Sequence, residues 1–294
     1  MKNRHISHCD FERRAFLHGT GALLGAFGAA SLVGCGPVRS QAQRGAEMRV
    51  LEERETRFGR LGVVEVGRRR YLAYGPGIQL VYQSVLDLDR PDELAAAYTR
   101  LMMLGVVYAQ PYSRMVQIGV GAGNMSGYAV RTFPSVVLHA IDIDRHAVEL
   151  GERYFGLAPH PRLHLHIEDG RRWLLDATGP FDVIMLDAYD DRSIPPALMT
   201  VEFFRLVAAR LAPGGTAMQN VCLPIVDTPR LLGTVRQAFA QVDLYRAGDN
   251  AVLAAYQGPA RTAAQLAARA RQLDAELRPL HSLSSLLGQR VTAI

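Results

Sequence analysis

The sequence predicts an α/β protein in which a doubly wound parallel sheet, covered by helices on both faces, follows a small N-terminal β domain. Three observations support this fold class. Beyond Tyr112, short apolar runs alternate with helical segments, which is the pattern of a parallel sheet built from βα units. Before that point, short β-like runs are separated by turns rich in glycine and proline. The 294 residues are 49% hydrophobic and 21% charged, the balance of a packed protein with a sizeable core.

Residues 1–34 have the pattern of an export signal. Basic residues precede a stretch from Gly19 to Gly34 that is uncharged and rich in Gly, Ala and Leu. Its sixteen residues are fewer than the about 20 that a membrane-spanning helix needs. The pair Arg13-Arg14 resembles the twin-arginine motif, and Leu32–Cys35 resembles a lipobox, in which the cysteine is acylated. The alternative is a dispensable basic tail before a short core helix.

These motifs predict a protein exported by the twin-arginine machinery and held at a membrane by a lipid on Cys35, on the periplasmic side of the bacterial envelope. Residues 35–48 would form a flexible tether. The formal charge of +5 falls to about +3 without the signal, because residues 1–34 hold four cations and two acids. So small an excess gives no reason to expect a nucleic acid as a partner.

Residues 49–110 are expected to form the small β domain and a connecting helix. Short β-like runs occur at residues 62–66 and 71–74, and a Gly-Pro-Gly turn leads to a further run through Tyr82. Pro91 and Asp92 suit the start of a helix, which the composition predicts over residues 91–103.

Residues 111–258 are expected to form the nucleoside-binding sheet and its helices, and residues 259–294 a helical tail. The predicted strands are 115–118, 136–141, 163–167, 183–186 and 216–221. The Pro-Gly-Gly sequence at 213–215 would make the turn into the fifth strand. The tail carries an apolar stripe that packing onto the domain would bury, with a partner interface as the alternative. Its members are Leu266, Ala270, Leu273 and Leu277.

Glycines and acidic residues gather where the predicted strands end. Gly119, Gly121 and Gly123 follow the first strand and precede a helical segment, which lets the backbone approach a ligand and leaves helix N–H groups free. Asp142 ends the second strand, 23 residues after Gly119, where a carboxylate can accept hydrogen bonds from a ribose diol. Asp169 ends the third strand. Taken singly, either aspartate could equally be a helix cap, but together they predict a nucleoside site.

Asp187 ends the fourth predicted strand and opens the acidic run Asp187-Ala188-Tyr189-Asp190-Asp191. Such a run attracts a cationic substrate, and a carboxylate there could accept a proton from an amine whose pKa is near that of lysine, about 10. The alternative is a solvated acidic loop. The position beside the predicted nucleoside site favours an amine-binding site.

Four motifs and two proline-containing segments follow one another in a recognisable order. They are Ile118–Gly123, Asp142–Asp144, Glu168–Gly170, Asp187–Asp190, Pro195 and Pro213–Gly215. They resemble the motifs of the spermidine synthase family of polyamine aminopropyltransferases, in its divergent bacterial branch, over about Phe58 to Tyr256. The resemblance implies a class I methyltransferase-like (Rossmann-like) sheet behind a small β domain. It also implies decarboxylated S-adenosylmethionine as donor substrate, a diamine such as putrescine as acceptor, and no prosthetic group or metal.

The resemblance further implies roles for individual residues. Asp142 would bind the ribose and Asp169 the adenine amino group. Asp187 would orient and deprotonate the attacking amine, and Asp190 would hold the cationic end of that substrate. The remaining donor-binding positions would be Gly119, Gly121, Gly123 and Gly170, and the remaining acceptor-binding positions Gln83 and Tyr98.

Three positions depart from the family pattern. Ala122 replaces the loop aspartate that binds the donor's amine, Thr99 replaces a glutamine, and Gly59 belongs to a pair that is commonly Tyr-Gln. Because an aspartate at position 122 would repel the carboxylate of S-adenosylmethionine itself, Ala122 keeps a second hypothesis open, a methyltransferase that uses that donor. A third hypothesis is an exported binding protein without turnover, since neither donor is expected to be plentiful outside the cytoplasm.

The composition excludes several other chemistries. Lys2 is the single lysine, which removes Schiff-base and lysine-nucleophile mechanisms from the rest of the chain. Three well-separated cysteines match neither a disulfide framework nor paired zinc ligands. His164 and His166 lie on one face of a predicted strand, but without a third ligand they are interpreted as surface or packing residues. The family resemblance leaves a homo-oligomer open.

Overall fold

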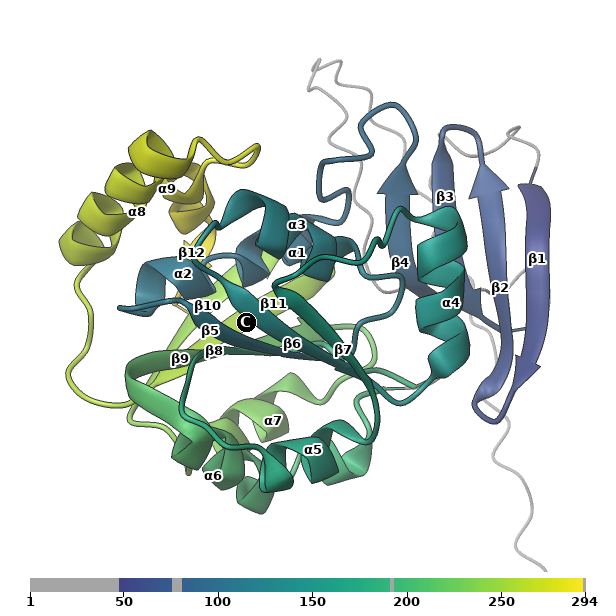
Figure 1. The fold of residues 1–294 in the computed structure, drawn as a ribbon. Helices are drawn as coiled ribbons and strands as arrows, with labels where there is room; N and C mark the ends of the chain where they lie inside the picture. The colour runs from purple at the N-terminus through teal and green to yellow at the C-terminus, as the bar shows by residue number, and fades with distance from the viewer. Residues whose placement is uncertain (1–47, 76–80, 191–192, 293–294) are drawn as a thin grey trace, which may run out of the picture. The chain divides into compact units, whose positions relative to one another are not determined.

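An antiparallel sheet opens the part of the chain that the computed structural model describes, residues 48–75, 81–190 and 193–292. Its strands lie in the order in which they occur in the sequence (Figure 1). They are β1 (Met48–Thr56), β2 (Gly59–Val66), β3 (Arg69–Tyr74) and β4 (Val81–Asp87). The sequence runs at 62–66 and 71–74 lie within β2 and β3, whereas β1 has no counterpart among the predicted strands.

The N-terminal sheet is covered on both faces, which explains why its inner strands are almost continuously apolar rather than alternating. Leu61, Leu72 and Tyr74 face one hydrophobic cluster, to which α4 (Arg145–Tyr154) contributes apolar side chains. Val64 and Tyr71 face a second cluster that includes Ala96 and other residues just before the main sheet. The N-terminal sheet is therefore packed between two segments that also border the main sheet.

The main sheet is mixed, with a parallel half and an antiparallel half. Its strand order is β12-β10-β11-β9-β8-β5-β6-β7. Strands β9, β8, β5, β6 and β7 run parallel to one another, and β10, β11 and β12 pair antiparallel. The bounds are β5 (Arg114–Ile118), β6 (Val137–Asp142), β7 (Leu163–Ile167), β8 (Phe181–Leu186), β9 (Leu211–Cys222), β10 (Gln241–Ala247), β11 (Asn250–Tyr256) and β12 (Arg290–Val291).

Helices cover both faces of this sheet (Figure 1). One face carries α1 (Ala97–Met102), α2 (Gly105–Tyr108), α3 (Asn124–Thr132), α8 (Ala263–Leu277) and α9 (Leu283–Leu286). The other face carries α5 (Gly170–Asp176), α6 (Val201–Arg210) and α7 (Thr228–Val235). Parallel strands covered in this way are buried on both sides, and all six residues of β8 are buried. The predicted Rossmann-like fold behind a small N-terminal sheet is confirmed.

Three details differ from the sequence expectations. The helix predicted over 91–103 begins only at Ala97, because Pro91 and Asp92 lie in turns in which Glu93 N–H donates to the carbonyl of Arg90. The Pro-Gly-Gly segment at 213–215 lies within β9 rather than before it. The antiparallel half of the sheet was not expected, since short strands from a hairpin near the end of the chain give the same apolar pattern as parallel ones.

The C-terminal tail packs on the main sheet as its apolar stripe predicts. Leu266, Ala270 and Leu273 of α8 are buried in the same hydrophobic cluster as α1, α2 and α3. A capping box starts this helix, with Thr262 and Gln265 each bonding the backbone N–H of the other. The predicted signal peptide, residues 1–34, and almost all of the tether lie outside the described residues, and the proposed domain boundaries stay predictions.

Candidate functional site

A cavity of about 330 Å³ lies between the N-terminal sheet and the carboxyl ends of β5, β6 and β8. It is bordered by residues of β4, by the segment before α1, and by the loops that follow these three strands. Of the residues to which the resemblance gives a role, those that line the cavity are Gln83, Tyr98, Gly119, Gly121, Asp142, Asp169, Gly170, Asp187 and Asp190. Carboxyl ends of parallel strands are where ligands bind in open α/β sheets. The fold thus gathers residues that are far apart in the sequence.

The glycine loop after β5 is shaped by close approaches of backbone. Gly119 has φ +88°, and a Cβ on it would meet the carbonyl oxygen of Asp187 at 2.3 Å. Gly121 has φ +55°, and a Cβ there would meet Ser84 Oγ at 2.7 Å. Gly123 does not line this cavity; it precedes α3 with φ +79° and packs against Leu157. Its place in the motif is therefore explained by backbone conformation and packing.

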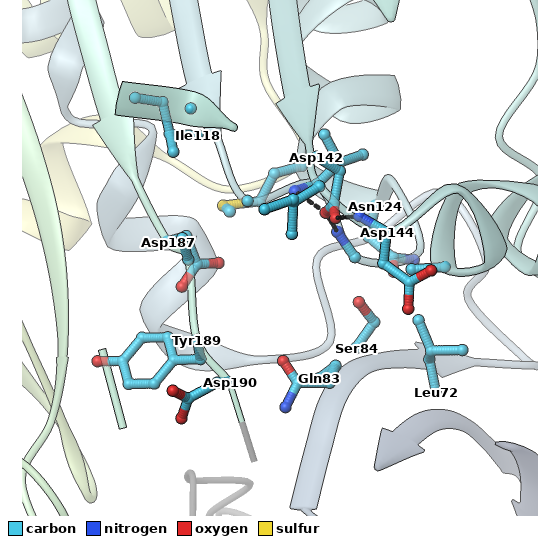
Figure 2. A pocket seen from close by; sticks show the side chains of 18 of the residues that line it. Leu72, Gln83, Ser84, Ile118, Asn124, Asp142, Asp144, Asp187, Tyr189 and Asp190 are labelled. Carbon is cyan, nitrogen blue, oxygen red and sulfur yellow. Dashed lines mark hydrogen bonds between the residues drawn. The ribbon is translucent and has the colours of Figure 1, made fainter. Parts of the chain in front are cut away.

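Asp142 at the end of β6 binds the backbone of the glycine loop through hydrogen bonds. Its Oδ2 accepts hydrogen bonds from the backbone N–H groups of Val120 at 2.8 Å and Gly121 at 3.0 Å (Figure 2). Its Oδ1 accepts from the N–H of Asp144 at 2.9 Å. Burial raises the pKa of Asp142, and these three donors oppose the rise. Much of the acceptor capacity of this carboxylate is thus used within the protein, which limits what a ribose could add.

Asp187 follows β8, and both oxygens of its carboxylate accept hydrogen bonds from side chains of other elements. Its Oδ1 accepts a hydrogen bond from Asn220 Nδ2 at 2.7 Å, and its Oδ2 accepts one from the Tyr98 hydroxyl at 3.2 Å. Burial raises the pKa of Asp187 to about 7, although both hydrogen bonds favour the ionised form and lower it. A carboxyl with a pKa near neutrality exchanges a proton readily at physiological pH, which suits general acid–base chemistry.

Two asparagines behind Asp187 were missed by the sequence reasoning. Asn220 lies near the end of β9 and Asn250 begins β11, and both are almost completely buried. Asn250 Nδ2 donates to Asn220 Oδ1 at 2.9 Å. No sequence motif joins these positions, because they are brought together by the antiparallel pairing of Asn250 opposite Cys222.

A β-bulge in β4 places two consecutive side chains at the cavity. The pairing of β3 with β4 passes from Leu72 opposite Ser84 to Ala73 opposite Tyr82, so Gln83 is the extra residue. Gln83 and Ser84 both line the cavity, which strict alternation along a strand would forbid. Figure 2 shows them across the cavity from the carboxylates of Asp187 and Asp190.

Asp169 and Asp190 lie at the margins of the cavity and already serve local structure. Asp169 caps α5, and its Oδ1 accepts from the N–H of Arg172 at 2.8 Å. Asp190 Oδ1 accepts from the N–H of Ser193 at 2.8 Å. Gly170 packs against β5, since a Cβ on it would meet Ile118 Cγ2 at 2.3 Å. Asp169 therefore both caps α5 and lines the cavity.

The three departures from the family pattern have clear positions. Ala122 is fully buried in the apolar cluster that includes α4, and its N–H donates to Ser84 Oγ at 3.0 Å. Thr99 turns its hydroxyl to the carbonyl of Ala96 at 2.6 Å. Gly59 begins β2 with φ +111°, a conformation that favours glycine. The glycine loop thus presents no carboxylate to the cavity.

The pair His164 and His166 is joined by His139, which the sequence analysis did not single out. His139 Nδ1 and His166 Nε2 are 3.0 Å apart, and the His139 and His164 rings stack with centroids 5.0 Å apart. Trp173 and Phe181 pack on the same group. Within residues 48–75, 81–190 and 193–292, no group of three or more His, Cys, Asp or Glu side chains could hold a metal ion. Packing is the role that these contacts support.

A Rossmann-like sheet with a glycine loop and acidic residues at successive strand ends is typical of α/β proteins that bind a ligand at the carboxyl ends of their strands. Comparison with known proteins gives the family within this class. The family model of the spermine/spermidine synthase domain matches residues 97–247, which is more than half of the chain. The chain belongs to the spermine/spermidine synthase family.

Curated relatives are named polyamine aminopropyltransferases. One from Chromobacterium violaceum is 30% identical over 139 residues, which cover 47% of this chain and 53% of the relative. One from Neisseria meningitidis is 28% identical over 174 residues, 58% of this chain and 65% of the relative. Polyamine aminopropyltransferase 2 of Pseudomonas aeruginosa is 32% identical over 188 residues, 56% of this chain and 52% of the relative. The chain spans about half to two thirds of the length of these relatives.

Solved structures agree with the fold. A spermidine synthase in complex with the transition-state analogue AdoDATO matches with a TM-score of 0.69 and 17% identity, over 84% of this chain and 87% of that one. Human methyltransferase-like protein 13 in complex with SAH matches with a TM-score of 0.57 and 22% identity, over 63% of this chain and 93% of that one. At these identities the likeness establishes the fold alone.

The prediction of an exported, lipid-anchored protein on the periplasmic side of the envelope is wrong. The relatives that match are polyamine aminopropyltransferases, and none of their names is that of an exported or lipid-anchored protein. The motifs on which that prediction rested, including Cys35, lie outside the described residues. The hypothesis of an exported binding protein without turnover depended on export and falls with it.

In the part of the chain that the structure describes, no helix combines the length and apolarity that crossing a membrane requires.

Proposed function

We propose that this protein is a polyamine aminopropyltransferase that transfers the aminopropyl group of decarboxylated S-adenosylmethionine to a diamine such as putrescine. The observation that carries the proposal is Asp187, a partly exposed carboxyl on the cavity between the two sheets, whose desolvation raises its pKa to about 7. The family and the names of the curated relatives support the same reaction class. No prosthetic group or metal enters the proposed chemistry.

In this reaction the nitrogen of a neutral amine attacks the methylene carbon bonded to the donor's sulfonium sulfur. The new C–N bond forms as the C–S bond breaks, and sulfur keeps the electron pair, leaving methylthioadenosine as a neutral thioether. The proton of the attacking amine passes to Asp187. Because the sulfonium is already a good leaving group, the protein contributes mainly by aligning the two reactants and accepting that proton.

The cavity offers distinct surroundings for the two substrates. The donor's nucleoside would lie along the glycine loop, with its ribose toward Asp142 and its adenine toward Asp169. The amine would lie between Asp187 and Asp190 on one side and Gln83 on the other, where Figure 2 shows these side chains facing the cavity. Tyr98 would hold the Asp187 carboxylate in place through its hydroxyl.

The test is formation of methylthioadenosine by the purified full chain, given decarboxylated S-adenosylmethionine and a panel of diamines. We expect product with at least one diamine and a loss of turnover of about a thousandfold or more in Asp187→Asn, as for removal of a general base together with the group that orients the amine. Asp92→Asn, an exposed carboxylate outside this cavity, is the matched control. Absence of methylthioadenosine with every diamine would contradict the proposal.

A second candidate is a methyltransferase that uses S-adenosylmethionine itself. The observation that favours it is Ala122, which leaves the glycine loop without a carboxylate to bind the donor's amine or to repel a donor carboxylate. Calorimetric titration with each donor separates the two functions. Tighter binding of the decarboxylated donor supports aminopropyl transfer, and tighter binding of S-adenosylmethionine supports methyl transfer.

A further inference from the structure

A continuous chain of side-chain hydrogen bonds leads from the core of the sheet to the cavity. Asn250 Nδ2 donates to Asn220 Oδ1 at 2.9 Å, and Asn220 Nδ2 donates to Asp187 Oδ1 at 2.7 Å. The hydroxyl of Tyr98 donates to the other oxygen of Asp187 at 3.2 Å. Three elements that are distant in the sequence, α1, β9 and β11, thus converge on one carboxylate.

The direction of this chain is fixed by the chemistry of its members. An ionised carboxylate only accepts hydrogen bonds, so the group facing Asp187 Oδ1 has to be a donor. The amide of Asn220 can present either its NH₂ or its oxygen to Asp187. The NH₂ of Asn250 selects between them, because only the oxygen of Asn220 can accept from it. With Asn250 donating to the oxygen of Asn220, the NH₂ of Asn220 is turned toward Asp187.

The backbone around these residues is held independently. Asn250 lies opposite Cys222 in the antiparallel pair of β11 and β9, and the N–H of Leu223 donates to the carbonyl of Asp249 at 2.9 Å. The carbonyl of Asn220 accepts from the Tyr189 hydroxyl at 3.0 Å and from Gln219 Nε2 at 2.7 Å. The two amides are therefore presented from a rigid sheet rather than from a loop.

We propose that Asn220 and Asn250 are positioning residues, with Asn220 orienting the Asp187 carboxylate toward the bound amine and Asn250 fixing which end of the Asn220 amide does so. This inference rests on the proposed role of Asp187 as the group that receives the amine's proton. Asn250 lies beyond the residues 97–247 that match the family domain, so this device extends past the matched region.

The same contact sets how tightly Asp187 holds a proton. The hydrogen bond from Asn220 lowers the pKa of Asp187 against the larger upward effect of burial, and the bond from Tyr98 acts in the same direction. The other titratable groups that line the cavity are Tyr74, Tyr82, Asp142, Asp144, Asp169, Tyr189 and Asp190. Among the groups around Asp187, the donors on Asn220 and Tyr98 are the ones that oppose desolvation.

The experiment compares the full chain with three variants, Asn220→Leu, Asn250→Leu and Thr216→Val. Leucine has the branched shape of asparagine, with two methyl groups in place of the amide atoms and no polar atom. Thr216→Val is the matched control, since it removes a buried polar group of the same strand, β9, whose hydroxyl donates to the backbone carbonyl of Ala255 at 3.2 Å. Circular dichroism and thermal melting establish that each variant folds, and Asn250→Leu keeps the test available if Asn220→Leu does not.

The first readout is the titration of the Asp187 carboxyl by ¹³C NMR, assigned with Asp187→Asn. We expect the pKa to rise by about one unit or more in Asn220→Leu, because a hydrogen bond to a charged group is lost. A smaller rise is expected in Asn250→Leu, and none in Thr216→Val. An unchanged pKa of Asp187 in Asn220→Leu, or an equal rise in Thr216→Val, would overturn the proposal.

The second readout is the pH profile of kcat/KM for the aminopropyl reaction. Its acidic limb should move to higher pH by the same amount as the carboxyl titration. Asn220→Leu should therefore lose about fivefold or more at neutral pH and recover part of the loss at high pH. A uniform loss at every pH contradicts the positioning role. The NMR titration needs no turnover, so it tests the positioning role even if the wild-type protein is inactive. Inactivity of the wild-type protein would contradict the proposed function alone.

Discussion

Replacing Asp187 by asparagine should stabilise the folded protein, and by more at high pH than at low pH. Burial raises the pKa of this carboxyl from 3.8 to about 7. Since the folded state binds the proton more tightly, the carboxyl's contribution to stability is present in full below pH 3.8 and is lost as the pH rises through 7. The whole loss is about 3 pKa units, or about 4 kcal/mol at 1.36 kcal/mol per unit.

The pH dependence follows from the same two values. Linkage gives a cost of ionising Asp187 of about 1.5 kcal/mol at pH 5 and about 4 kcal/mol at pH 8. Asparagine stays neutral at both, and its amide can still accept from Asn220 and face the Tyr98 hydroxyl. The stability advantage of Asp187→Asn over wild type should therefore grow by about 2.5 kcal/mol between pH 5 and pH 8.

Urea unfolding followed by circular dichroism at both pH values measures this difference directly. The exposed Asp92→Asn serves as the control for the Asp-to-Asn substitution itself. An advantage of Asp187→Asn that is the same at pH 5 and pH 8 would refute the reasoning, because it would mean that the carboxyl titrates alike in the folded and unfolded chain. A gain of stability on removal of the carboxyl that we propose to accept the amine's proton is the trade-off expected at a catalytic site.

Further predictions concern packing and the histidine group. Burial lowers the pKa of His139 to about 4, so stability should be lost as the pH falls from about 6.5 toward 4, and His139→Phe should reduce that loss in urea unfolding at pH 7 and pH 4.5. Tyr74→Phe removes the hydroxyl that donates to Asp144 and should cost about 1–3 kcal/mol, measured by the same unfolding at pH 7, where an unchanged midpoint would contradict it. Gly151→Ala should destabilise by about 1–3 kcal/mol, since its Cβ would meet a backbone carbonyl oxygen at 2.7 Å. Gly233→Ala, in a helix with nothing within 4 Å, should stabilise by about 0.5–1 kcal/mol, and equal effects of the two glycine changes would refute the packing argument.

The sequence predicts the parts of the site that lie at the ends of parallel strands. Asp142, Asp169 and Asp187 each follow a short apolar run, and the topology of such a sheet brings those positions to one edge. The glycine loop is predictable for the same reason, although Gly123 precedes α3 and does not line the cavity. The apolar pattern of the strands and the topology of a parallel sheet are enough to predict the positions of these residues.

The residues that the sequence does not predict depend on irregular or long-range pairing. Asn220 and Asn250 meet because strands β9 and β11 pair antiparallel. The spacing of 30 residues between them does not predict this contact. Ser84 lines the cavity beside Gln83, which the family resemblance does predict, because a bulge interrupts the alternation of β4. His139 lies in an apolar run, and the sequence of that run does not show whether the imidazole ring packs against its neighbours or binds a metal ion. In each case the deciding information is a register between strands, which a single sequence leaves open.

Because β4 belongs to the N-terminal sheet and lines the cavity, ligand binding is coupled to the separation of the two sheets. Gln83 and Ser84 come from the N-terminal sheet, while the glycine loop and Asp187 come from the main sheet, so the cavity is complete only while the two sheets remain docked. A ligand that contacts both must then hold them together, and its binding free energy adds to the energy needed to separate them. Amide hydrogens of β3 and β4 should exchange more slowly with solvent once the cavity is filled, even though most of them never touch the ligand.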